Sequence, residues 1–143
     1  MTLAPFHLAF PVYDIDATRR FYAEVLGCDI GRQAERWIDF DFFGHQLSAH
    51  LTTRESQPLV SNEVDRQAVP ARHFGVVLPP LQWDQLVARL TQQAIDFYIE
   101  PYTRFAGQVG EQRTFFIKDP SDNYLEFKTF PDQTAIFAPS PST

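Results

Sequence analysis

The sequence contains a single cysteine, Cys28, so one chain cannot form an internal disulfide. A lone cysteine is typical of a reducing compartment, and we expect Cys28 to be a small buried side chain. Long hydrophobic runs are also absent, since stretches such as Val76–Leu78 fall far short of the roughly 20 residues that span a bilayer. The first residues lack a basic stretch that leads into an apolar one. We therefore expect a cytoplasmic protein that does not enter a membrane.

Basic residues are in the minority: 12 Lys and Arg stand against 18 Asp and Glu, for a net charge of −6 without a basic cluster. Such a chain is repelled by a phosphate backbone, so a nucleic acid is not an expected partner. What the sequence does have is 143 residues of which 44% are hydrophobic and 15% aromatic, enough to bury the core of one domain. A small molecule is the expected partner.

The first half of the chain is predicted to form a strand, a helix and three further strands. Phe6–Val12 is apolar, and a helix follows because Asp14 is a suitable N-cap and apolar residues recur at helical spacing as far as Gly27. Alternation and turn residues then mark three strands. Their ranges are Asp29–Ala34, Arg36–Phe43 and Gln46–Leu51.

The second half repeats this order. Arg72–Leu78 is a strand, Pro79–Pro80 interrupts it, and the spacing of apolar residues from Trp83 to Leu90 predicts an amphipathic helix. Three strands follow, with a loop over Pro101–Glu111. The strands are Asp96–Glu100, Gln112–Lys118 and Tyr124–Thr129.

The repeated order predicts an α+β fold of two βαβββ modules with mixed sheets. The modules are expected at residues 5–53 and 72–129 of a single domain that covers residues 1–130. Between them, residues 54–71 carry prolines and charges without a sustained period, which predicts a connector with at most a little local structure. Residues 131–143 are expected to form a flexible tail.

Ionisable residues fall at matching points of the two halves. His7 aligns with His73 at the start of each module, and the last strands can be aligned so that His50 matches Glu126. If a pseudo-twofold axis relates the modules, all four side chains converge on a concavity between the sheets. The duplication therefore predicts a site built from distant parts of the chain.

Two imidazoles and one carboxylate are suitable ligands for Fe(II), Mn(II), Ni(II) or Zn(II), and three protein ligands leave positions open for substrate. Glu126 lies in an otherwise apolar strand, where an unpaired carboxylate would be costly to bury. We therefore predict that His7, His73 and Glu126 bind one divalent metal ion. His45 lies in a turn and is expected to be solvated, and Asp39 and Asp41 alternate with apolar residues as in an ordinary half-exposed strand, without a chemical role.

Three segments carry a resemblance to a known family: HLAFPVYDIDATRRFYAEVLG at His7–Gly27, HFGVVL at His73–Leu78 and DPSDNYLEF at Asp119–Phe127. With these motifs the chain resembles the vicinal oxygen chelate superfamily, which includes glyoxalase I, extradiol dioxygenases, methylmalonyl-CoA epimerase and the fosfomycin and bleomycin resistance proteins. The resemblance implies the same metal ligands, His7, His73 and Glu126. The first half further resembles a bacterial subgroup described as dioxygenases of the extradiol type.

His50 has two interpretations under this resemblance. Glyoxalase I and the epimerase have a fourth metal ligand at that strand position, whereas extradiol dioxygenases have a nearby histidine that exchanges protons. Imidazole chemistry suits the second role, so His50 is the expected catalytic acid–base group and an alternative fourth ligand. One departure is Phe116, where extradiol enzymes often have a tyrosine. Substitutes for that phenol would be Tyr98, Tyr102 or Tyr124, and cations that could meet an anionic substrate are Arg104 and Lys128.

The leading hypothesis is an Fe(II) dioxygenase of the extradiol type that acts on a small chelating diol or enol. The alternative is a lyase or isomerase of the glyoxalase I type, with Ni(II) or Zn(II) and a metal-bound enediolate. A third hypothesis, a non-catalytic binding or resistance protein, is disfavoured by the metal residues. The resemblance also implies a homodimer, with the site formed within one chain or shared between two copies.

Overall fold

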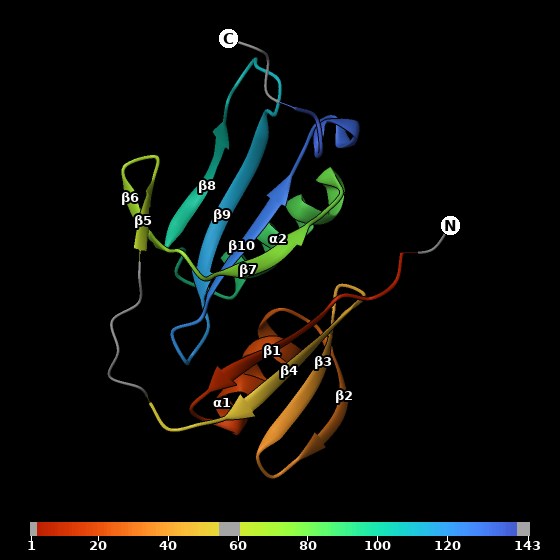
Figure 1. The fold of residues 1–143 in the computed structure, drawn as a ribbon, viewed down its shortest axis with the longest axis vertical. Helices are drawn as coiled ribbons and strands as arrows, with labels where there is room; N and C mark the ends of the chain where they lie inside the picture. The colour runs from red at the N-terminus through yellow and green to blue at the C-terminus, as the bar shows by residue number, and fades with distance from the viewer. Residues whose placement is uncertain (1–2, 55–60, 140–143) are drawn as a thin grey trace. The chain divides into compact units, whose positions relative to one another are not determined.

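A computed structural model describes residues 3–54 and 61–139 of the chain, which divides into two compact units. The first unit comprises Met1–Pro58 and Asp119–Asn123, and the second comprises Leu59–Lys118 and Tyr124–Thr143. Each unit contains one four-stranded mixed sheet and one helical segment before its later strands (Figure 1). The predicted α+β fold with two βαβββ modules is therefore confirmed, whereas one domain over residues 1–130 stays a prediction.

In the first unit the strands lie in the order β1-β4-β3-β2, with β1 parallel to β4 and the other neighbours antiparallel. The helix begins as predicted at Asp14, whose carboxylate accepts from the backbone N–H of Ala17 at 2.9 Å. A π-helical turn continues it and buries Tyr22, and Cys28 is also buried. The elements are β1 (His7–Val12), α1 (Ile15–Arg19), η1 (Arg20–Val25), β2 (Asp29–Ala34), β3 (Trp37–Phe42) and β4 (His45–Leu51).

The second unit repeats the order as β7-β10-β9-β8, again with its outer pair, β7 and β10, parallel. Helix α2 follows Pro79 and Pro80, and its Trp83 donates from Nε1 to the carbonyl of Phe127 at 2.9 Å. Buried residues of β9 and β10, such as Phe115, form the core of this unit. The elements are β7 (Phe74–Val77), α2 (Pro80–Gln92), β8 (Ile99–Arg104), β9 (Gln112–Lys118), β10 (Tyr124–Thr129) and the 3-10 turn η2 (Gln133–Ala135).

The structure departs from the sequence prediction in the connector and at β8. Part of the connector forms a hairpin of β5 (Ser61–Val64) and β6 (Gln67–Pro70), whose turn has positive φ angles at Asp65 and Arg66. Strand β8 begins later than predicted and extends through Pro101 to Arg104. Proline is tolerated there because β8 is an edge strand and has a bulge between Ile99 and Tyr102.

The turn between β9 and β10 packs with the first unit, although both strands belong to the second. Its anchor is Asp119, which is 4% exposed and accepts from the hydroxyl of Tyr22 and from the backbone N–H groups of Ser121 and Asn123, each at 2.9 Å. Burial raises the pKa of the Asp119 carboxyl, and burial together with the Asp119 charge raises the pKa of Tyr22 well above its usual value. The turn is thus part of the first unit's core.

None of the helices within residues 3–54 and 61–139 has both the length and the hydrophobicity that a membrane-spanning helix needs.

Candidate metal centre

The second unit brings two of the predicted ligands together. Glu126 lies in the middle of β10, paired with Gly75 on β7 and with Phe116 on β9. The approach of β7 is close: a Cβ atom built on Gly75 would lie 1.5 Å from the carbonyl oxygen of Glu126. Glycine at this position therefore lets β7 run beside the glutamate strand and brings His73, the residue before β7, next to Glu126.

The ring of His73 is oriented by the β5–β6 hairpin. Its Nδ1 lies 2.9 Å from the carbonyl oxygen of Pro70, and its Nε2 lies 3.3 Å from Oε1 of Glu126. Because a carbonyl can only accept, Nδ1 carries the hydrogen and the other nitrogen faces the glutamate. This is the arrangement by which histidine ligands are commonly held for a metal, with the second nitrogen bonded to a backbone carbonyl.

Glu126 is 8% exposed, and each of its oxygens has a polar neighbour. Oε2 accepts from the hydroxyl of Thr114 at 2.6 Å, while Oε1 faces His73 and lies 3.7 Å from Nζ of Lys128. A cavity of about 270 Å³ opens beside the carboxylate and is lined by His73, Glu126, Lys128 and strand β7. The burial cost anticipated for Glu126 is therefore offset by the Thr114 hydroxyl on one side and by the Lys128 ammonium on the other.

The geometry of this pair fits a metal ion. Two ligand atoms bound at about 2.1 Å to one ion, with an angle of about 90–110° between them, lie about 3.0–3.4 Å apart. The 3.3 Å between Nε2 of His73 and Oε1 of Glu126 falls in that range. Over the described residues, no group of three or more His, Cys, Asp or Glu side chains is assembled, so the pair forms two of the three predicted ligands.

The other two candidates belong to the first unit. His7 and His50 are both exposed, but β1 pairs with β4 so that His7 is opposite Gln46 and His50 is opposite Pro11. The two histidines are thus separated by four residues along the strands, or about 13 Å. The structure does not bring them together, and the role of His50 stays a prediction.

The strand register corrects the alignment of His50 with Glu126. Glu126 pairs with Gly75 in the second unit, and Ala9, the counterpart of Gly75, pairs with Ser48 in the first. Ser48 is therefore the structural counterpart of Glu126, and His50 lies two residues further along β4. A two-residue shift keeps a side chain on the same face of a strand, so alternation in the sequence could not distinguish the two alignments.

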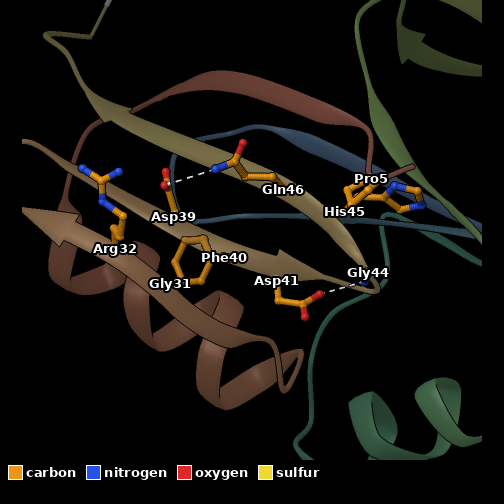
Figure 2. Close-up of a pocket in the computed structure, with 9 residues that line it drawn as sticks. All are labelled: Pro5, Gly31, Arg32, Asp39, Phe40, Asp41, Gly44, His45 and Gln46. Carbon is orange, nitrogen blue, oxygen red and sulfur yellow. Dashed lines mark hydrogen bonds between the residues drawn. The ribbon is translucent and has the colours of Figure 1, made fainter. Parts of the chain in front are cut away.

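Ser48 donates a 2.6 Å hydrogen bond to Oδ1 of Asp39, which is half-buried and lines a pocket of about 350 Å³ on the first unit. Figure 2 shows this pocket, with Asp39 directed towards Gln46 and Asp41 directed towards Gly44. Asp41 accepts from the backbone N–H of Gly44 at 2.7 Å and so stabilises the β3–β4 turn. The pocket holds none of the predicted metal ligands.

Two of the three candidate phenols, Tyr98 and Tyr102, and the candidate cation Arg104 are engaged with the hairpin. Tyr98 donates to the carbonyl of Ala68, Tyr102 donates to Oδ2 of Asp65, and Nε of Arg104 lies 2.7 Å from the same Asp65 oxygen. Burial and the Asp65 hydrogen bond raise the pKa of Tyr102 to about 12, and that hydrogen bond lowers the pKa of Asp65. Sequence reasoning missed both Asp65 and Thr114, because neither stands out by type or spacing.

The chain repeats a βαβββ order, and in the second unit His73, just before β7, lies next to the buried Glu126 on β10. These features define a protein of two βαβββ modules with a polar site on one of its sheets. The sequence profile of the Glyoxalase/Bleomycin resistance protein/Dioxygenase superfamily matches residues 5–127. The chain belongs to this superfamily, whose members typically bind a divalent metal.

Individual proteins are similar to this chain over most of its length. A solved glyoxalase/bleomycin resistance protein/dioxygenase from Alicyclobacillus acidocaldarius is 36% identical, with 94% of this chain and 96% of that chain covered and a TM-score of 0.81. Virulence protein STM3117 of Salmonella typhimurium is 26% identical over 124 residues, which are 87% of this chain and 82% of that protein. The fosfomycin resistance protein FosX of Listeria monocytogenes shares the fold alone, at 12% identity, 94% and 98% coverage and a TM-score of 0.68.

Proposed function

We propose that this protein is a metal-dependent enzyme that acts on a small chelating molecule, with His7, His73 and Glu126 as the ligands of one divalent ion. The observation that carries the proposal is the 3.3 Å pair of His73 and Glu126. Each member is held by a further hydrogen bond, from Nδ1 of His73 to Pro70 and from Thr114 to Glu126, so that both free ligand atoms face one point. His7 would supply the third ligand.

The reaction we propose is a dioxygenation of the extradiol type, on a small diol or enol. In the first unit the counterpart of Glu126 is Ser48, which is a poor metal ligand. This supports a metal centre with three protein ligands and open coordination positions. An Fe(II) ion bound there would supply a Lewis acid and a binding place for oxygen. Lys128, 3.7 Å from Glu126, would attract an anionic substrate towards the cavity, and His50 would exchange protons with it.

Metal analysis and oxygen uptake test this proposal. Protein purified without chelators is expected to contain close to one iron per site, and the Fe(II) form is expected to consume oxygen with at least one member of a catechol panel. Glu126→Gln, which keeps the shape of the side chain, should lose both metal and activity. Iron-loaded protein that consumes no oxygen with any catechol would contradict the dioxygenase assignment, and a protein that binds no divalent metal would contradict the metal centre.

A second candidate is a lyase or isomerase of the glyoxalase type, and a specific observation favours it. Phe116 lies beside Glu126 where extradiol enzymes often have a tyrosine, and the phenols of Tyr98 and Tyr102 are both engaged with the hairpin, which leaves only Tyr124 of the three possible substitutes. Anaerobic conversion of an α-ketoaldehyde thiol adduct by the Ni(II) or Zn(II) form would favour this candidate. A His50→Ala variant that retains metal but loses turnover would assign His50 to proton transfer, and loss of metal would make it a fourth ligand.

We also propose that the protein is a homodimer. In one arrangement His7 completes the metal site with His73 and Glu126 of its own copy, and in the other with His73 and Glu126 of the second copy. Mixing two inactive variants, His7→Ala and Glu126→Gln, distinguishes these arrangements. A site shared between copies regains activity in the mixed dimer, because one of its two sites then has all three ligands. A site within one chain stays inactive in the mixture.

A further inference from the structure

We propose that Asp65, at the tip of the β5–β6 hairpin, is a positioning residue for His73, so that a contact remote from the metal sets the affinity of the centre. The inference rests on the proposed function in so far as His73 is a metal ligand. It gives a function to the hairpin, which lies in the segment that was predicted from the sequence to be a connector. The hairpin is held at its tip through Asp65 and contacts the surroundings of His73 at its base through Val69 and Pro70.

The tip is held by the carboxylate of Asp65. Its Oδ2 accepts a 2.5 Å hydrogen bond from the hydroxyl of Tyr102 and lies 2.7 Å from Nε of Arg104, and its Oδ1 lies 3.5 Å from a second Arg104 nitrogen. Both donors come from β8, which lies at one edge of the second unit's sheet. Asp65 is exposed, but Arg104 and Tyr102 are half-buried, so the contact joins a turn to a fixed strand.

The base of the hairpin reaches the metal ligand in two ways. Val69 is 1% exposed and packs with Ile99 and Phe116, and the rings of Phe116 and His73 are in edge-type contact with centroids 5.3 Å apart. The next residue, Pro70, presents the carbonyl that accepts from Nδ1 of His73 at 2.9 Å. Strand β6 therefore supplies the hydrogen-bond acceptor of the imidazole and packs against Phe116, the aromatic ring that borders it.

An isolated two-stranded hairpin is marginally stable, so its position depends on such anchors. Releasing the tip allows β6 to shift, and a displaced Pro70 carbonyl no longer selects the ring nitrogen that carries the hydrogen. Loss of a contact that orients a ligand typically weakens metal binding by about 10- to 100-fold. Because Asp65 acts through Pro70, we expect a loss of about 10-fold, at the lower end of that range.

The first test uses the metal-free protein and side-chain ¹H–¹⁵N spectra of the histidines in mildly alkaline buffer. In the wild type, His73 is expected to hold its hydrogen on Nδ1. Asp65→Asn keeps a residue suited to the left-handed turn but removes the charge, and it should give a mixture of the two tautomers. Glu63→Gln removes the same charge from an exposed position on β5 and should leave the spectrum unchanged. A fixed Nδ1–H tautomer in Asp65→Asn would overturn the proposal.

The second test is a calorimetric titration of the same proteins with Mn²⁺. Asp65→Asn should weaken binding about 10-fold, and Tyr102→Phe, which leaves the ion pair between Asp65 and Arg104 in place, should weaken it less. The double variant should bind no more weakly than Asp65→Asn, because the Asp65 change already disrupts the Tyr102 contact. Equal affinity of wild type and Asp65→Asn would overturn the positioning role. A wild type that binds no Mn²⁺ or other divalent ion would contradict the proposed function, and the tautomer spectra would then still decide whether Asp65 positions His73.

Discussion

The hydroxyl of Thr114 on β9 donates a 2.6 Å hydrogen bond to Oε2 of Glu126 on β10. Both residues are almost fully buried, so this bond fixes the carboxylate and turns its other oxygen towards His73. Replacing the donor leaves a buried carboxylate oxygen without its hydrogen bond. The pair therefore links the stability of the sheet to the geometry of the candidate metal centre.

We predict that Thr114→Val lowers affinity for a divalent metal by about 10- to 100-fold and the free energy of unfolding by about 1–3 kcal/mol. Thr114→Ser keeps the hydroxyl and should stay within a few-fold of the wild type in metal affinity. Calorimetric titration and denaturant unfolding measure the two quantities. Equal metal affinities of the Val and Ser variants would show that the hydrogen bond does not orient Glu126.

A second prediction concerns the hydrogen bond between Tyr22 and Asp119. The Asp119→Asn and Tyr22→Phe variants should each be destabilised by about 1–3 kcal/mol, because each removes the buried hydrogen bond from the Tyr22 hydroxyl to the Asp119 carboxylate. Since both remove one contact, the double variant should cost less than the sum of the single changes. Strict additivity in urea unfolding would show that the hydroxyl and the carboxylate do not act as a pair.

The alkaline titration of tyrosine gives a third prediction. The pKa of Tyr102 is raised to about 12, so its phenol stays protonated in the folded protein above the ordinary tyrosine pKa of about 10. The stability contributed by this anchor is therefore complete below pH of about 10 and is lost as the pH rises towards about 12. Subtracting the tyrosinate absorbance curve of Tyr102→Phe from that of the wild type should give a midpoint near 12.

The Asp65→Asn variant is the control for this titration. Burial and the hydrogen bond to Asp65 both raise the Tyr102 pKa, so the variant should titrate at a lower pH than the wild type. A wild-type midpoint close to that of free tyrosine would indicate that Tyr102 does not hold the hairpin in solution.

The two strand glycines Gly75 and Gly31 provide a matched pair of substitutions. Gly75→Ala should cost about 3 kcal/mol or more and abolish metal binding, because its Cβ would overlap the backbone of Glu126. Gly31→Ala should be tolerated, since its Cβ would meet Asp39 at 3.5 Å, an ordinary contact distance. Thermal unfolding and metal titration compare the two. A Gly75→Ala protein with wild-type stability would mean that β7 can move away from β10 without loss.

Much of the fold could be predicted from the sequence because the duplication repeats its signals. Periodicity located the strands of both sheets, and Asp14 located the start of the first helix. Strand β8 was placed too early because Pro101 suggested a loop, whereas an edge strand can accept a proline. The β5–β6 hairpin was missed because Arg66 adopts a left-handed conformation in the turn position where a glycine after Asp65 would give the usual hairpin signal.

The sequence could predict which residues belong to the candidate site, but it could not predict the contacts that hold them. His73 and Glu126 were identified by their matching positions and by the cost of burying a carboxylate, and the structure brings them together. The alignment of His50 failed because alternation defines which face a side chain occupies but not the register between strands. Thr114 and Asp65 could not be found, since their importance depends on partners distant in sequence.

The Asp119–Asn123 turn has a consequence for how the chain can be divided. Separating the two compact units takes three cuts, after Pro58, Lys118 and Asn123, because the second half of the sequence contributes a piece of the first unit. A fragment ending at Pro58 would lack the acceptor for the Tyr22 hydroxyl, and the complementary fragment would carry Asp119 without its donor. The two halves of this duplicated chain are therefore expected to fold poorly alone and to recover only by fragment complementation.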